Sequence, residues 1–216
     1  MSTARVDIKV VLLGKEYGGK TSLVERFLHD RFAESIAYQN TIGAAFGAKK
    51  VMINGEPVTL GVWDTAGSER YQAMSRMYYR GAVAAIICVN LTEAESFLRA
   101  KYWVDELQSC EGDSCRLFLV GTKCDLVTQD KSLRKVEANV LQSYGQEVGA
   151  FVIETSAKTG QNVGKLFDKI AKDCHPKAGA PANTLTNNIA LHTKETETSS
   201  KPGGSRCCGG GGGDSK

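Results

Sequence analysis

Apolar and polar positions divide the first 175 residues into alternating strand-like and helix-like segments. Four nearly continuous apolar runs are typical of parallel strands buried on both faces, at residues 6–13, 84–89, 117–120 and 151–153. Apolar residues recur at helical spacing in residues 23–28, 97–107, 136–144 and 163–171. Strands that alternate with helices predict a mostly parallel sheet covered by helices on both faces.

Two more strands are predicted on either side of Asn54-Gly55, a dipeptide that accepts the positive φ angles of a tight hairpin turn. The flanking segments read V-M-I and V-T-L-G-V-W, and the short turn between them makes the pair antiparallel. The complete pattern therefore predicts an α/β fold with a six-stranded sheet, in which one strand is antiparallel.

Composition limits the chain to one domain and a tail. With 216 residues, 42% of them apolar, it has room for one core-bearing domain of ordinary size. We expect this domain at residues 1–175 and a flexible tail at 176–216, where few large apolar side chains offset the entropy of ordering. No apolar run matches the length of a bilayer span, and the N-terminus lacks the apolar core of a secretion signal. These features predict a cytoplasmic protein.

The charged residues and cysteines exclude several classes of site. A net charge of +3, with lysine and arginine scattered evenly, argues against nucleic-acid binding. Seven cysteines without a C-x-x-C pair fit neither a disulfide framework nor a zinc site. Cys88 and Cys124, in or beside apolar runs, are predicted to be buried free thiols, whereas Cys207-Cys208 in the glycine-rich tail requires another interpretation.

Residues 14–21, G-K-E-Y-G-G-K-T, match the phosphate-binding pattern G-x-x-x-x-G-K-[ST] between a predicted strand and a predicted helix. Glycines let backbone N–H groups approach phosphate oxygens, and the helix N-terminus adds positive potential. Lys20 is expected to neutralise the β- and γ-phosphates, and Thr21 to ligate Mg²⁺. The other residues of this predicted nucleotide-binding loop are Gly14, Glu16, Tyr17, Gly18, Gly19 and Ser22. A plain glycine turn and an ATP-binding loop remain alternatives at this point.

The sequence D-T-A-G, residues 64–67, ends the second strand of the hairpin. Asp64 is placed to hold Mg²⁺ through water, and the Gly67 N–H to bond a γ-phosphate oxygen. Thr41, in the loop before the hairpin, is a candidate contact to both Mg²⁺ and the γ-phosphate, although a lone loop threonine is usually a capping group. Two loops would then contact the phosphate that hydrolysis removes, which is how a nucleotide orders or releases a surface.

T-K-C-D at residues 122–125 and T-S-A-K at residues 155–158 each follow a predicted buried strand, at the edge where open α/β sheets bind ligands. The Asp125 carboxylate can accept hydrogen bonds from both N1–H and N2–H₂ of guanine, a pairing that adenine does not offer. This favours GTP over ATP. The other candidates for the base-binding loops are Thr122, Lys123, Ser156, Ala157 and Lys158.

These motifs, in this order and context, resemble those of the Ras-like small GTPases. I-G-A-A-F, W-D-T-A-G-S-E-R-Y, Y-Y-R-G-A and L-T-E-A-E-S-F are similar to the Rab family of vesicle-traffic regulators, over about residues 6–174. The E-Y of the phosphate loop, the serine after D-T-A-G and the threonine before K-C-D most resemble an atypical Rab branch linked to autophagy and late endosomal traffic. The resemblance implies a P-loop small G-domain, GTP/GDP and Mg²⁺ as cofactors, and effector, exchange-factor and GTPase-activating partners at loops 33–46 and 67–80.

One departure from the usual family pattern concerns the guanine site. Most members have asparagine before Lys123, whereas Thr122 keeps a hydroxyl but loses the amide that ties the base loop to the phosphate loop. We expect guanine binding to be weaker by about 1 kcal/mol. Phe32 stands at the position of the aromatic ring that stacks on guanine and would offset part of this loss, or it is an ordinary core phenylalanine.

A second departure concerns hydrolysis, for which the resemblance implicates Lys20, Thr41, Gly67 and Ser68. Ser68 stands where the family usually has the glutamine that orients the attacking water, and serine does not reach as far. Intrinsic hydrolysis is therefore expected below the rate of Ras, on the order of 10⁻⁴ per second. GTPase-activating proteins of the TBC type supply both an arginine and a glutamine. Such a partner would still complete hydrolysis here if Glu16 and Tyr17 leave room for it, and we expect both side chains to point outward.

A third departure lies in the tail. Cys207-Cys208 corresponds to the cysteine pair that carries geranylgeranyl chains in Rab proteins, but the longer extension G-G-G-G-G-D-S-K follows it. Prenylation and two free thiols both remain open. A prenylated protein would cycle between the cytoplasm and endosomal or autophagosomal membranes.

The sequence thus predicts a monomeric guanine-nucleotide switch in vesicle traffic that hydrolyses GTP slowly. The main alternative is a scaffold that holds GTP with negligible hydrolysis. Ser68, Glu16 and Tyr17 favour this alternative, whereas the intact phosphate and Mg²⁺ ligands Lys20, Thr21, Thr41 and Asp64 favour the enzyme. An ATP kinase is a distant third, because no catalytic base or phosphoacceptor-binding lobe is evident.

Overall fold

The computed structural model describes residues 5–32, 41, 43–68 and 72–175, and for residues 72–75 the backbone alone. All of them lie in the first of two compact units, Met1–Ala180, and the second unit, Pro181–Lys216, contains none. The predicted tail with Cys207 and Cys208, and parts of the two predicted effector loops, therefore lie outside the described residues.

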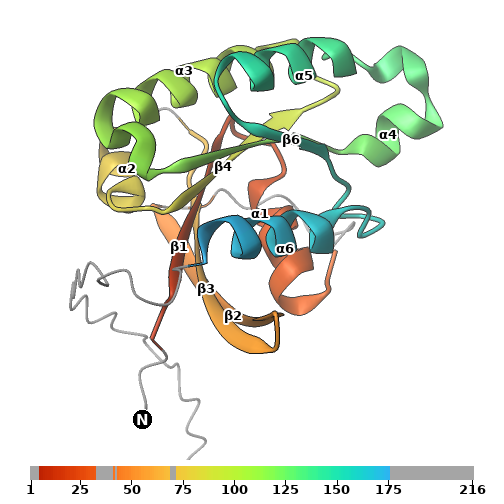
Figure 1. Cartoon of the computed structure of the whole chain (residues 1–216). Helices are drawn as coiled ribbons and strands as arrows, with labels where there is room; N and C mark the ends of the chain where they lie inside the picture. The colour runs from red at the N-terminus through yellow and green to blue at the C-terminus, as the bar shows by residue number, and fades with distance from the viewer. Residues whose placement is uncertain (1–4, 33–40, 42, 69–71, 176–216) are drawn as a thin grey trace, which may run out of the picture. The chain divides into compact units, whose positions relative to one another are not determined.

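A six-stranded sheet runs through the domain in the order β2-β3-β1-β4-β5-β6 (Figure 1). Its strands are β1 (Ile8–Gly14), β2 (Ala44–Ile53), β3 (Glu56–Thr65), β4 (Ala84–Asn90), β5 (Arg116–Thr122) and β6 (Phe151–Glu154). β2 pairs with β3 antiparallel, and the other strand pairs of the sheet are parallel. Asn54 and Gly55 form the hairpin turn with φ angles of 52° and 87°. The predicted six-stranded sheet with one antiparallel strand is confirmed.

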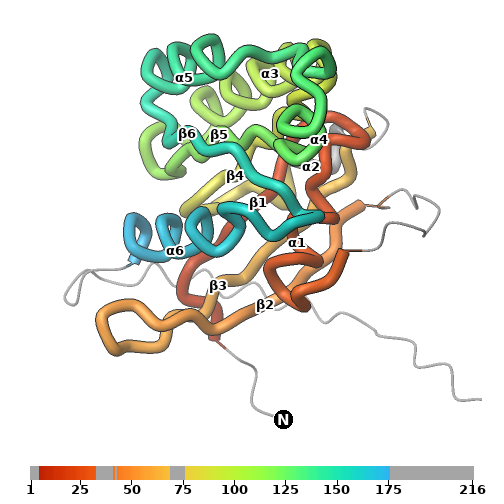
Figure 2. The backbone as a smooth tube through the Cα atoms, turned by 90° about the vertical axis from the view of Figure 1, so that its right-hand side faces the viewer, coloured from red at the N-terminus to blue at the C-terminus, as the bar shows by residue number. Residues whose placement is uncertain are grey.

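Helices cover both faces of this sheet (Figures 1 and 2). One face carries α1 (Lys20–His29) and α6 (Val163–Cys174), and the other carries α2 (Gln72–Tyr79), α3 (Ala94–Glu111) and α5 (Ala138–Glu147). The alternation of β1 shows why its sequence is apolar throughout. Val10 and Leu12 pack into the core beneath α1 and α6, whereas Val11 and Leu13 pack into the opposite core.

Two helices were not predicted, α2 and the short α4 (Cys124–Gln129). They are only eight and six residues long, and apolar spacing is a dependable helix signal mainly in longer segments. The predicted free thiols are confirmed, because Cys88 and Cys124 are buried and unbridged. Among the described residues no helix has the length and apolar character of a membrane span.

The strand order fixes where a ligand can bind. After β1 the chain builds β2 and β3 on one side, and it then returns to place β4 on the other side of β1. Open α/β sheets bind ligands at such a switch point, beyond the carboxyl ends of the strands. The phosphate loop follows β1, D-T-A-G ends β3, and the two base-binding motifs follow or end β5 and β6, so all of them meet at this edge.

Candidate functional site

The segment between β1 and α1 closes around the Lys20 ammonium group. Lys20 Nζ donates to the carbonyl oxygens of Gly14 and Lys15 at 3.1 and 2.8 Å, and the residue is only 5% exposed. Burial lowers the pKa of Lys20, because the charged ammonium group is removed from water. Both hydrogen-bond partners are neutral, and the nearby Asp64 and Glu16 carboxylates offset the effect of burial only in part, so an anion in this loop would stabilise the ammonium group further.

The glycines and Tyr17 give this loop its backbone path. Gly19 has a φ of 84° immediately before the first turn of α1, a conformation that glycine adopts without strain. Tyr17 also has a positive φ, 61°, and its residue is 55% exposed, so its predicted outward orientation is confirmed. Glu16 is half-buried, and its predicted outward orientation stays a prediction.

Three oxygen-bearing side chains converge beside this loop. Thr21 Oγ1 donates to Asp64 Oδ2 at 2.6 Å and lies 3.2 Å from Thr41 Oγ1. Asp64 is 2% exposed, burial raises its pKa, and its Oδ1 has no hydrogen-bond partner among the described residues. Mg²⁺ prefers oxygen ligands of this kind, bound directly or through water. The buried, unsatisfied carboxylate oxygen therefore fits a site for this ion.

D-T-A-G packs directly on the phosphate loop. A Cβ atom at Gly67 would clash with Lys20 Nζ and would lie 2.5 Å from the Glu16 backbone nitrogen, so only glycine permits this approach. The Ala66 N–H donates to the Gly43 carbonyl at 2.8 Å, which joins D-T-A-G to the segment that follows Thr41. Ser68, half-buried, is the last residue described before the gap at 69–71.

The two base-binding motifs are joined to each other. Asp125 is buried in the first turn of α4. This helix begins directly after Lys123, whose φ is 62°. The Cys124 N–H donates to the Thr155 carbonyl at 3.1 Å. Ser156 is fully buried, and its hydroxyl accepts a hydrogen bond from the Thr159 N–H at 3.1 Å. The structure therefore brings T-K-C-D and T-S-A-K together, as the sequence predicts.

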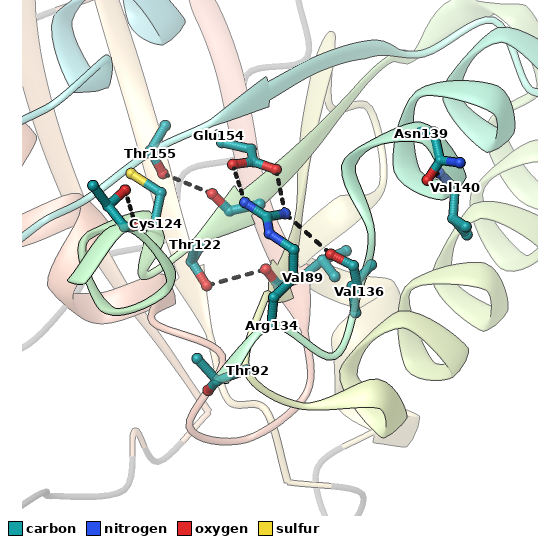
Figure 3. A network of polar contacts seen from close by, with 12 residues as sticks. Val89, Thr92, Thr122, Cys124, Arg134, Val136, Asn139, Val140, Glu154 and Thr155 are labelled. Atoms are coloured by element: carbon teal, nitrogen blue, oxygen red, sulfur yellow. Dashed lines mark hydrogen bonds and ion pairs between the residues drawn. The ribbon is translucent and has the colours of Figure 1, made fainter. Parts of the chain in front are cut away.

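Thr122 retains a tie between the base loop and the phosphate loop. Its hydroxyl lies 2.7 Å from the Gly18 carbonyl and 3.2 Å from the Val89 carbonyl, and the second contact is drawn in Figure 3. A hydroxyl has one hydrogen, so it donates to one of these carbonyls at a time. The side-chain amide of asparagine has two hydrogens, so it would donate to both carbonyls at once.

Replacing Thr122 with valine tests this tie. The side chain keeps its shape but leaves the buried Gly18 carbonyl without its donor, which costs about 1 kcal/mol or roughly a fivefold loss of GDP affinity. Thr122→Asn is the matched variant and should bind GDP more tightly than the unchanged protein. Calorimetric titration with GDP and Mg²⁺ measures both. Equal affinities in all three proteins would show that the contact does not support the site.

Phe32 is not a core residue, because it is 37% exposed and belongs to neither buried cluster. This overturns the core interpretation. Residues 33–40, which follow it, lie outside the described part of the chain, so stacking of Phe32 on guanine stays a prediction.

Two arginines that the sequence analysis did not select support the base loops. Arg26 of α1 donates through Nε to the Ala157 carbonyl at 2.7 Å and through Nη2 to the Lys158 carbonyl at 2.9 Å. Arg134 forms a two-pronged ion pair with Glu154, at 2.8 and 2.9 Å, just before T-S-A-K (Figure 3). Each arginine is distant in sequence from its partner and belongs to no motif, so the sequence spacing did not indicate either contact.

Comparison with known proteins agrees with this geometry. The profile of the Ras family matches residues 9–176. The chain is 38% identical to the Ras-related protein Rab-24 of Dictyostelium discoideum, over 94% of this chain and 99% of that protein. It is 47% identical to the Ras-related protein RABF2b of Arabidopsis thaliana, over 77% and 80%, and 46% identical to the Ras-related protein RHN1 of Nicotiana plumbaginifolia, over 88% and 94%.

The chain therefore belongs to the Ras family and is a small GTPase of the Rab type.

Proposed function

We propose that this protein is a guanine-nucleotide switch that regulates intracellular vesicle traffic and hydrolyses GTP to GDP and phosphate slowly. One observation carries the proposal. The buried ammonium group of Lys20, the oxygen cluster of Thr21, Thr41 and Asp64, and the buried carboxylate of Asp125 lie at the same edge of one sheet. Such an edge fits a ligand with phosphates at one end and a purine at the other.

In this proposal each group has one task. Lys20 and the backbone N–H groups of the loop bind the β- and γ-phosphates, and Gly67 N–H contacts the γ-phosphate. Thr21, Thr41 and Asp64 hold Mg²⁺, which neutralises charge on the β- and γ-phosphates when it is bound. Asp125 selects guanine. Segments 33–46 and 67–80 then change order with the γ-phosphate, and they contact effectors, exchange factors and GTPase-activating proteins.

Ser68 is the reason for proposing slow hydrolysis. A serine side chain ends too close to the backbone to orient an attacking water as a glutamine does. We expect Ser68→Gln to raise the single-turnover rate of phosphate release from bound GTP about tenfold, toward the intrinsic rate of Ras, on the order of 10⁻⁴ per second. The measurement uses labelled GTP loaded on purified protein, with Ser68→Ala as the matched control that should stay slow. No gain in Ser68→Gln would contradict a limiting role for this position.

A second candidate function is a GTP-holding scaffold with negligible hydrolysis. The half-buried Glu16 and the exposed Tyr17 favour it, because both lie beside the segment where an activating arginine would enter. The same release assay separates the two functions. Phosphate release that does not exceed the uncatalysed background in the unchanged protein would select the scaffold.

The membrane connection rests on family membership and on the tail. The matched relatives carry the names Rab-24, RABF2b and Rab5, which supports a role in vesicle traffic, and the resemblance to an autophagy-linked Rab branch narrows it to endosomal or autophagosomal membranes. Two prenyl chains on Cys207 and Cys208 would anchor a monomer that otherwise stays in the cytoplasm. Mass spectrometry of protein from its native cell tests this, and unmodified thiols at both positions would refute it.

A further inference from the structure

We propose that Glu93 is a positioning residue that ties the phosphate loop to the connection between β4 and α3 through Lys15, and thereby slows nucleotide release. Glu93 lies in the connection between β4 and α3, outside every motif that the sequence analysis assigned to the nucleotide. The inference rests on the proposed guanine-nucleotide site and adds a residue to it.

Lys15 is the link between Glu93 and the phosphate loop. Its ammonium group forms ion pairs with the carboxylates of Glu93 and Glu95. Its own carbonyl oxygen accepts hydrogen bonds from Lys20 Nζ at 2.8 Å and from the Gly18 N–H at 3.1 Å. The ion pairs therefore hold Lys15 in place, and the Lys15 carbonyl in turn holds the Lys20 ammonium group and the turn of the loop at Gly18.

Glu93 stands on a rigid support. Its N–H donates to the Asn90 carbonyl at 3.1 Å, and the Asn90 side chain accepts from the Thr92 N–H and hydroxyl at 3.1 and 2.9 Å. The Asn90 N–H in turn donates to Ser96 Oγ at 2.8 Å, at the start of α3. These bonds attach the turn that carries Glu93 to the end of β4. The position of its carboxylate is thus set by the sheet rather than by a free loop.

Lys123 of the base loop is affected by the charge of the same carboxylate. It is half-buried between the strand ends, where burial lowers its pKa while the nearby Glu93 and Asp125 carboxylates oppose that change. The ion pair of Lys15 with Glu93 and the hydrogen bond from Thr122 to the Gly18 carbonyl attach the phosphate loop to the neighbouring strand ends at two points.

The test is the rate at which a fluorescent GDP analogue dissociates from the full chain in the presence of Mg²⁺. We expect Glu93→Gln to speed dissociation about threefold at 20 mM salt, because partly exposed ion pairs contribute modestly, and less than about 1.5-fold at 500 mM salt, where screening removes the interaction. In a Lys15→Gln background the same substitution should have a smaller effect. Loss of packing alone would change the rate equally at both salt concentrations.

Two variants serve as controls. Glu95→Gln removes the more exposed partner of Lys15, and it should change the rate less than Glu93→Gln. Asp113→Asn removes an equal charge at the opposite edge of the sheet, before β5, and it should leave the rate unchanged. Unchanged dissociation from Glu93→Gln, a salt-independent increase, or an equal increase from Glu95→Gln would each overturn the inference. Absence of GDP binding by the unsubstituted protein would instead overturn the proposed function, and the inference with it.

Discussion

Asp125→Asn is expected to move the purine preference of this protein from guanine to xanthine. The buried carboxylate offers two acceptors to the N1–H and N2–H₂ donors of guanine, whereas an amide offers one acceptor and one donor. The amide leaves one guanine donor unmatched and removes a charge-assisted bond, at a cost of about 3 kcal/mol or roughly a hundredfold in affinity. Xanthine carries a carbonyl in place of the 2-amino group, and it can accept from the new amide.

Competition between GDP and XDP, followed by displacement of a fluorescent nucleotide, measures this change. Asp113→Asn again provides a charge-matched control and should keep the guanine preference. Retention of GDP selectivity by Asp125→Asn would mean that another group reads the base. In that case the predicted role of T-K-C-D would be wrong, while the phosphate site would be unaffected.

Lys20→Met is expected to separate nucleotide affinity from the stability of the empty protein. The methionine keeps an unbranched apolar stem but loses the ammonium group, so the charge-assisted bonds to the phosphates disappear and GDP affinity falls by about a hundredfold or more. Without nucleotide, the same charge is buried against neutral carbonyls at a cost in desolvation. Removing it should leave the melting temperature of the nucleotide-free protein unchanged or raise it.

Thermal melts with and without GDP and Mg²⁺ give both quantities from one preparation. The unchanged protein should gain stability on adding nucleotide, and the variant should gain about 2.7 kcal/mol less at the same saturating nucleotide concentration. A variant that melts much lower without nucleotide would indicate that Lys20 mainly supports the fold. A variant that still binds GDP with native affinity would contradict its assignment as the phosphate-binding lysine.

The centre of the sheet was predictable because β1, β4 and β5 are buried on both faces, so that runs such as residues 84–89 are continuously apolar and end abruptly. The hairpin was predictable because Asn54-Gly55 accepts positive φ angles. Short helices such as α4 were not predictable, because their positions depend on the loops that they support.

The grouping of the motif residues at one edge of the sheet was predictable for a different reason. Each motif is expected to bind a chemical group that demands a particular residue type at a particular distance from a strand end. Supporting contacts lack this property. Arg26, Arg134 and Glu93 act through partners that are distant in sequence, and several residue types could occupy their positions, so only the folded chain identifies them.

The two hydrogen bonds of Arg26 connect α1 to the T-S-A-K loop. The first turn of this helix carries Lys20 and Thr21, the proposed phosphate and Mg²⁺ ligands, and one or two turns later Arg26 donates to the carbonyls of Ala157 and Lys158 beside the proposed guanine site. A regulator that tilts this ten-residue rod would therefore disturb the grip on both ends of the bound molecule together. Exchange would then proceed as a single concerted opening, with no stage at which the sugar and base are released while the phosphates stay fixed.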